Sequence, residues 1–146
     1  MKRIFNLFVA GVFATAILGT QSCTKTCDAG YEGSDCKTEV RAKIIGTYKV
    51  VENCSSTGAA NYNVSITKSG TDVQVVLVNP MGGYTGITGT GTVEGTSLTF
   101  ATQTQSGYTF SAGTGTISAD GGTISMSYTV AAGGQTETCT GTCTKQ

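Results

Sequence analysis

Apolar and polar residues alternate along most of the chain after residue 44, and a period of two is typical of β-strands that bury one face. The clearest example is ISMSYTV, residues 124–130, where every second residue is apolar and the others are Ser or Thr. We predict strands at Gly46–Cys54, Asn61–Thr67, Asp72–Val78, Ile87–Gly95, Ser97–Gln103, Tyr108–Ser118, Ile124–Val130 and Gln135–Thr144.

Turn signals separate these segments, among them KSGTD at 68–72, EGTS at 94–97 and ADGG at 119–122. Such short connections favour hairpins between successive strands. The sequence therefore predicts an all-β domain, an eight-stranded antiparallel up-and-down meander that closes into a small barrel or a flattened sandwich. Within Tyr108–Ser118 the apolar residues switch from even to odd positions, which predicts a β-bulge near Ala112 and Gly113.

Six cysteines are present, at positions 23, 27, 36, 54, 139 and 143. In a closed meander the first and last strands are neighbours, so Cys54 meets the strand that holds Cys139 and Cys143. Either cysteine is a candidate partner, and we favour a Cys54–Cys139 disulfide that locks the first strand of the barrel to the last. Cys143 is then expected to be a spare thiol in a frayed C-terminus.

The first 22 residues predict an export signal, because Lys2 and Arg3 precede an apolar run, residues 4–18, that is short for a permanent membrane span. The sequence GTQSC that follows resembles the lipobox of bacterial lipoproteins, in the loose form of Bacteroidetes. The resemblance implies that Cys23 becomes an acylated membrane anchor, and Thr24 after it points to the outer membrane. Ordinary signal-peptidase cleavage at the same bond is the alternative, and it leaves all six cysteines free to pair.

The stretch CDAGYEGSDC, Cys27–Cys36, fits the pattern C-x-x-G-[YF]-x-G-x-x-C, which resembles the last disulfide loop of an EGF-like module. The resemblance implies a Cys27–Cys36 disulfide. The other cysteines and the calcium-binding residues of a complete module have no counterpart, so it implies no calcium site. The loop is then either a plain disulfide-closed spacer or a small recognition knob. TEVRAK, residues 38–43, predicts a linker or a single helical turn.

This order of parts, with the segment VRAKIIGTYKVVENC and a final CTGTCTK, resembles a group of uncharacterised Bacteroidetes lipoproteins, and the meander is lipocalin-like. The resulting organisation is a signal peptide at 1–22, the anchor and disulfide loop at 23–37, a linker at 38–43 and the β-domain at 44–146. The resemblance implies a place in the cell envelope, facing the periplasm or the outer surface. It implies no activity.

Composition removes several classes of function. No histidine is present, which excludes histidine-dependent nucleophiles and histidine-containing zinc sites. The acidic residues of the β-domain fall mostly at turns or strand ends, where solvated charge is usual. We therefore expect no enzyme, no cofactor and no metal. Nine basic residues balance nine acidic ones, so a nucleic-acid partner is not expected.

Gly89 and Gly91 alternate with Ile87 and Val93 and so lack inward side chains. Either rings from other strands fill this space, or it is part of a ligand cavity lined by Tyr48, Tyr62, Phe100, Phe110 and Tyr128. Three functions remain open. The first is a lipid-anchored, non-catalytic binding or interaction module, the second a lipocalin-like carrier of a small apolar ligand. The third is a structural or adhesive surface protein that meets a macromolecule through Thr-rich strands and the loop at 80–86.

Overall fold

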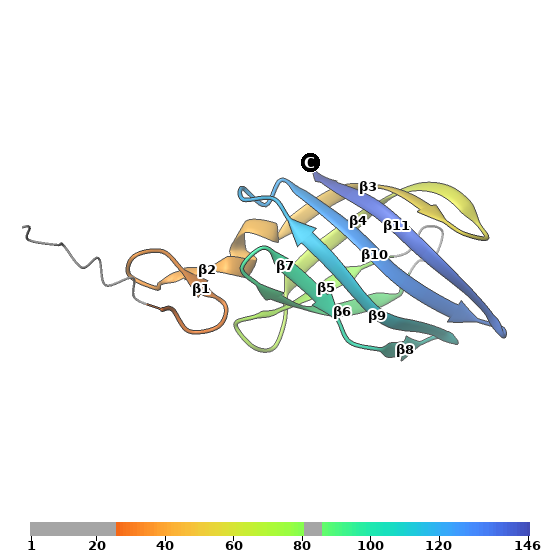
Figure 1. Ribbon diagram of the computed structural model, residues 1–146, viewed down its shortest axis with the longest axis horizontal. Coiled ribbons are helices and arrows are strands. Elements are labelled where there is room, and N and C mark those ends of the chain that lie inside the picture. The colour runs from red at the N-terminus through yellow and green to blue at the C-terminus, as the bar shows by residue number, and fades with distance from the viewer. Residues whose placement is uncertain (1–25, 81–85) are drawn as a thin grey trace, which may run out of the picture.

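The computed structural model describes residues 26–80 and 86–146, so the predicted export signal, Cys23 and residues 81–85 of the loop at 80–86 lie outside the described residues. Nearly all of the described secondary structure is β-strand (Figure 1). The elements are β1 (Tyr31–Glu32), β2 (Thr38–Glu39), the 3-10 helix η1 (Val40–Ile44), β3 (Gly46–Cys54), β4 (Gly58–Lys68), β5 (Gln74–Val78), β6 (Thr88–Glu94), β7 (Ser97–Phe100), β8 (Gln103–Gln105), β9 (Tyr108–Ile117), β10 (Thr123–Ala132) and β11 (Gln135–Lys145).

Eight strands form a closed antiparallel barrel in the order β3-β4-β5-β6-β7-β9-β10-β11, and β11 pairs back with β3. This is the predicted up-and-down meander, in its closed form. β8 is an additional short strand that pairs with β9. The prediction of one continuous strand over Ser97–Gln103 was wrong, because the chain leaves the barrel wall at Ala101 and Thr102.

The bulge predicted in β9 is confirmed, and it accounts for this interruption. Ser127 pairs with Thr114 and Thr129 pairs with Ser111, so Ala112 and Gly113 together lie opposite a single residue of β10. On the other side of β9, the pairing with β7 ends at Gly113 and the pairing with β8 begins at Phe110. A bulge bends and twists its strand, and the wall divides at this point.

Inward-facing side chains form two apolar clusters inside the barrel. The larger lies toward η1 and includes Ile44, Tyr48, Val50, Val64, Ile66, Leu77, Leu98, Ile124 and Cys143. The smaller contains Cys54, Ile87, Phe110, Tyr128, Val130 and Cys139. Beside the larger cluster, Gly91 makes room for its neighbours: a Cβ at this position would lie 2.8 Å from Leu98 Cδ1 and 2.9 Å from Phe100 Cε1. Side chains therefore occupy the space that Gly91 leaves.

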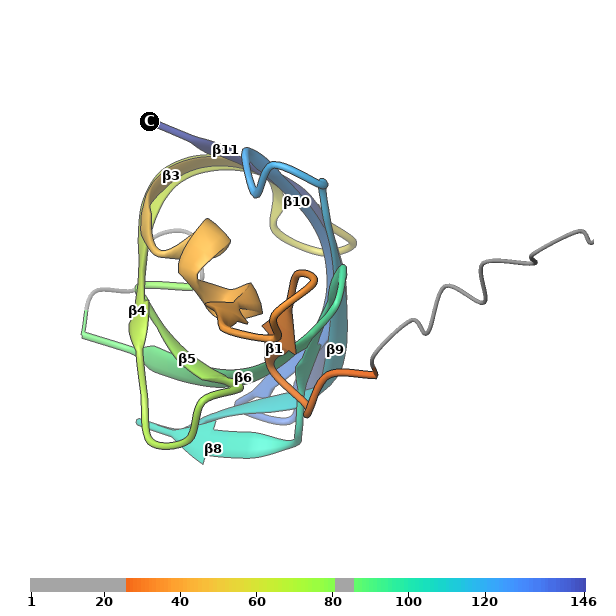
Figure 2. The same cartoon turned by 90° about the vertical axis from the view of Figure 1, so that its left-hand side faces the viewer.

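The two ends of the barrel differ. η1 lies across one end, seen face-on in Figure 2, and the small disulfide loop that carries β1 and β2 lies beside it. We call this the closed end. The hairpin turns β3–β4, β8–β9 and β10–β11 lie at the other end, which we call the open end (Figure 1). Among the described residues, no helix is long and apolar enough to cross a membrane.

The structure contains the two expected disulfides. Cys27–Cys36 closes the N-terminal loop, and Cys54–Cys139 joins β3 to β11 at the open end. Cys143 is a free thiol, as expected, but its predicted place in a frayed C-terminus was wrong: Cys143 is fully buried and pairs in register with Val50 and Ile124 in the middle of the sheet. The C-terminal strand is not frayed there, because closure of the barrel gives β11 a partner on both sides.

Candidate functional site

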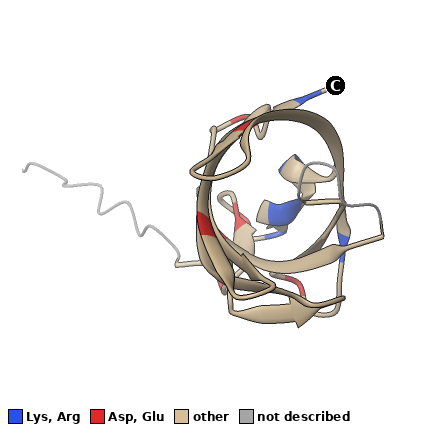
Figure 3. Ribbon diagram, turned by 90° about the vertical axis from the view of Figure 1, so that its right-hand side faces the viewer, with Lys and Arg blue, Asp and Glu red and all other residues tan. Residues whose placement is uncertain are grey.

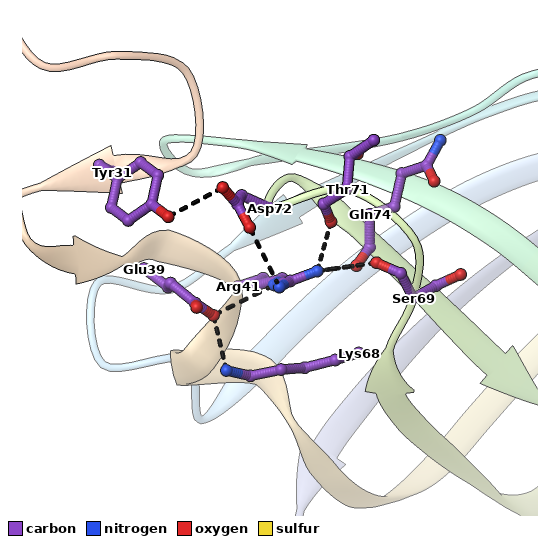
Figure 4. Close-up of polar contacts among 8 residues, drawn as sticks. All are labelled: Tyr31, Glu39, Arg41, Lys68, Ser69, Thr71, Asp72 and Gln74. Atoms are coloured by element: carbon purple, nitrogen blue, oxygen red, sulfur yellow. Dashed lines mark hydrogen bonds and ion pairs between the residues drawn. The ribbon is translucent and has the colours of Figure 1, made fainter.

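A buried arginine holds the closed end together. Arg41 in η1 is only 6% exposed, and its Nη1 donates to the carbonyl oxygens of Ser69 (2.8 Å), Gln74 (2.9 Å) and Thr71 (Figure 4). These carbonyls belong to the β4–β5 turn and its flanks. The planar guanidinium presents several N–H groups in a fixed fork, which suits such a set of converging acceptors. Arg41 thereby ties η1 to the rim of the barrel.

Acidic residues complete this cluster and attach the N-terminal loop. Arg41 Nε lies 3.2 Å and Lys68 Nζ 2.7 Å from Glu39 Oε2. Lys68, then Arg41, hold the pKa of Glu39 below its ordinary value. The hydroxyl of Tyr31 donates to Asp72 Oδ2 at 2.9 Å (Figure 4). The loop is therefore bound to the barrel by side-chain contacts as well as by the chain.

Gly30 brings the same loop against the barrel. Its φ is +87°, in the region that favours glycine, and an added Cβ would lie 2.6 Å from Val73 Cγ1. This close approach explains one of the two glycines in the EGF-like pattern: it serves docking of the loop as well as the tight turn.

Tyr48 fills the core near the closed end. Its hydroxyl donates to the Gly121 carbonyl at 2.7 Å, and Lys145 Nζ lies 5.9 Å from the centre of its ring. Burial, with smaller contributions from Cys143 and Asp120, raises the pKa of Tyr48 to about 12. Burial also raises the pKa of the Cys143 thiol to about 12. Both groups are thus neutral parts of the core near physiological pH.

A polar trio lies inside the barrel toward the open end. Glu52 is 4% exposed, and its Oε2 accepts hydrogen bonds from the hydroxyls of Tyr62 (2.9 Å) and Tyr128. The Tyr62 hydroxyl also lies 2.9 Å from the Pro80 carbonyl, so its one proton faces two acceptors. Burial is the main cause that raises the pKa of both tyrosines. Gly141 lies opposite Glu52 in β11, and an added Cβ there would lie 3.2 Å from the Val51 carbonyl oxygen and 3.4 Å from Glu52 Cβ.

A small apolar pocket lies beside this trio. Its volume is only about 20 Å³, enough for about one water molecule and far below the several hundred Å³ of usual ligand pockets. The rings of Phe110 and Tyr128 stand 5.5 Å apart on one side of it. The lining residues are Leu77, Pro80, Gly89, Phe100, Gln103, Phe110, Ser111, Met126 and Tyr128.

A larger pocket opens at the mouth of the barrel. It has a volume of about 280 Å³ and is lined by Ser56, Thr57, Tyr108, Val130, Ala132, Gln135, Thr136 and Glu137. Glu137 Oε2 accepts hydrogen bonds from the backbone N–H and the hydroxyl of Thr57, so its carboxylate is held in place on the rim. Figure 3 views the barrel from this end, with the basic segment of η1 on the far side of the ring of strands. This mouth pocket combines apolar walls with a few fixed polar groups, as binding sites do.

Three of the five predicted cavity residues line the small interior pocket, namely Phe100, Phe110 and Tyr128. Tyr62 does not line it but hydrogen-bonds to the carbonyl of Pro80, which does. Tyr48 belongs to the packed core near the closed end. Glu52 was missed as a buried group, because we grouped it with acids at turns and strand ends. Its even position, shared with Tyr48 and Val50, was the signal that it faces inward.

Glu52, Cys54 and Cys139 bring possible ligand atoms within 4.8 Å of one another. Both cysteines are in a disulfide, so they offer no thiolate to a metal ion.

Fold and site together define a small disulfide-locked β-barrel with one plugged end and a pocket at the other. Searches with protein-family models and against curated protein sequences found no match.

Proposed function

We propose that this protein is an exported, lipid-anchored component of the bacterial cell envelope, and that its barrel is a non-catalytic binding module. Its ligand or partner would bind at the mouth pocket. The observation that carries this proposal is the opposite position of two features: the N-terminal loop is attached at the closed end, and the mouth pocket lies at the open end. An anchor at Cys23, a few residues before the loop, would leave the mouth directed away from the membrane.

The chemistry of the mouth supports binding rather than catalysis. Tyr108, Val130 and Ala132 supply apolar surface, while Thr57 and Glu137 are held by their mutual hydrogen bonds. A catalytic base or nucleophile needs a reactive group with a partner that activates it. The two disulfides suit an oxidising compartment outside the cytoplasm.

Native mass spectrometry of the protein purified from its own host tests the binding function. We expect a retained small molecule or peptide, and we expect Ala132→Phe to abolish its retention because the new ring fills the mouth pocket. Ala131→Phe is the matched control, since neighbouring strand residues face opposite sides of the wall. Equal retention by both variants would contradict a site at the mouth.

Mass spectrometry of the mature N-terminus tests the anchor: an unmodified Cys23 would contradict lipidation.

A lipocalin-like carrier of a small apolar ligand is the second candidate. The ring-lined interior pocket favours it, although that pocket must widen from about 20 Å³ before it holds such a ligand. A carried ligand would shift the NMR signals of Phe100 and Phe110, and its retention would survive Ala132→Phe if it enters elsewhere. A ligand confined to the mouth would leave those ring signals unchanged.

A further inference from the structure

The barrel wall contains a seam where two strands separate. β6 pairs with β7 only over Thr92–Glu94, and β8 pairs with β9. Toward the open end, Thr88 and Thr90 of β6 therefore face β8 without ladder pairing between these two strands. We use "seam" for this space between Thr88–Thr90 and Gln103–Gln105.

Side-chain amides occupy the seam in place of a strand. Gln103 Oε1 accepts from the Thr90 N–H at 2.8 Å, and its Nε2 donates to the Thr90 carbonyl at 2.9 Å. Two residues along β6, the Thr88 N–H donates to Gln105 Oε1 at 2.8 Å. A primary amide carries the same donor and acceptor as a peptide group. The two glutamines therefore reproduce, at strand spacing, contacts that a neighbouring backbone would make.

The seam also gives access to an apolar pocket. Gln103 lines the small interior pocket together with Leu77, Pro80, Phe100 and Phe110. Displacement of the Gln103 side chain would add its volume to this pocket. The glutamine hydrogen bonds lie in exposed positions, so water can replace them when the side chains swing outward.

We propose that the seam binds an extended peptide segment of a partner protein by β-strand addition. Recognition of this kind combines main-chain hydrogen bonds to an exposed strand with a pocket for alternate side chains. The backbones of Thr88 and Thr90 supply the main-chain hydrogen bonds, and the pocket behind Gln103 receives a side chain of the peptide. The residues of the seam are uncharged Thr and Gln, so the fitting segment is an uncharged one that adopts extended structure, with a small apolar side chain facing inward.

A short synthetic peptide tests this site. The probe is a fluorescent heptapeptide of alternating threonine and valine between terminal lysines. We expect binding that shifts the amide NMR signals of Thr88 and Thr90. Gln103→Ala removes the competing amide and is expected to tighten binding about threefold or more, as the loss of one or two competing hydrogen bonds predicts. Gln146→Ala, at an exposed position outside the seam and the mouth pocket, is the matched control and should leave affinity unchanged.

The same peptide with alternate amides N-methylated separates backbone pairing from apolar adhesion, because it keeps the side chains and loses the donors. Loss of binding on methylation supports strand addition. Equal binding of both peptides, no binding to wild type or Gln103→Ala, or shifts confined to the mouth would overturn the proposal. Because Ala132→Phe blocks only the mouth, failure of the seam and failure of the proposed mouth site give different results.

Discussion

At the closed end of the barrel, the buried Arg41 binds three carbonyls of the β4–β5 turn and its flanks, over a continuous apolar core. At the open end, the Cys54–Cys139 disulfide and the polar trio around Glu52 hold the strands around a pocket. The closed end is filled with side chains such as Ile44, Tyr48 and Leu98, all fully buried. Dense packing stabilises a structure but leaves little free space. The open end keeps a pocket, and a covalent bond between its first and last strands compensates for a smaller core.

The largest predicted effect is loss of the open-end disulfide. Cys54→Ala with Cys139→Ala should lower the free energy of unfolding by about 4 to 5 kcal/mol, because the bond closes a loop between residues 85 apart. Denaturant titration followed by tyrosine fluorescence measures it. Removing Cys27–Cys36, whose residues are 9 apart, should cost about 2.5 kcal/mol or less. Equal losses of unfolding free energy for the two disulfides would contradict a special dependence of the open end on Cys54–Cys139.

Arg41→Met tests the closed end in the same assay. We expect a loss of about 3 kcal/mol, because carbonyls of the β4–β5 turn and its flanks lose a buried, charged donor. Arg41→Lys should still lose part of this stability, because a single ammonium group lacks the fork geometry of the guanidinium. Lys43→Met, in the same helix, removes a more exposed ion pair with Glu32 and should cost less than about 1 kcal/mol. Similar losses at both positions would contradict a special role for Arg41.

The polar trio of the open end is tested by a double-mutant cycle. Tyr128→Phe should cost about 1 to 2 kcal/mol in the wild-type protein, because Glu52 loses a buried hydrogen-bond donor. In a Glu52→Leu background the same change should be neutral or stabilising, since the hydroxyl there has already lost its acceptor. Tyr31→Phe at the closed end is the control and should be additive with Glu52→Leu. Additivity at Tyr128 would show that the two groups act independently.

The sequence pattern predicted the strands of both ends because alternation is a local property. It placed Gly46–Cys54 at its observed bounds, and the parity switch located the bulge at Ala112 and Gly113. Closure followed from topology, which brought Cys54 to Cys139. Each of these inferences needed only the period of two and the adjacency of the first and last strands.

The polar contacts that distinguish the two ends were not predictable in the same way. Arg41 lies in a short charged segment, and its carbonyl acceptors are 28 to 33 residues away in a turn, where backbone groups carry no sequence signal. Gln103 ends the strand predicted over Ser97–Gln103 and Gln105 lies beyond it, so the period of two did not indicate that both side chains hydrogen-bond to β6. The position of Glu52 was readable from parity, but its tyrosine partners were not.

The smallest predicted effect is a dependence on acid pH that originates at the closed end. The pKa of Glu39 is lowered in the folded protein, chiefly by Lys68 and then by Arg41, so its contribution to stability is present above its ordinary pKa of 4.5. That contribution is lost as the pH falls below 4.5 and through the lowered value.

Lys68→Met should therefore lower stability slightly at neutral pH, and its difference from wild type should shrink in acid. Lys68 and Glu39 are both partly exposed, so added salt should also reduce the difference. Denaturant titrations at several pH values measure it. A difference that stays constant from neutral pH into acid would instead assign the effect of Lys68 to packing of its side chain.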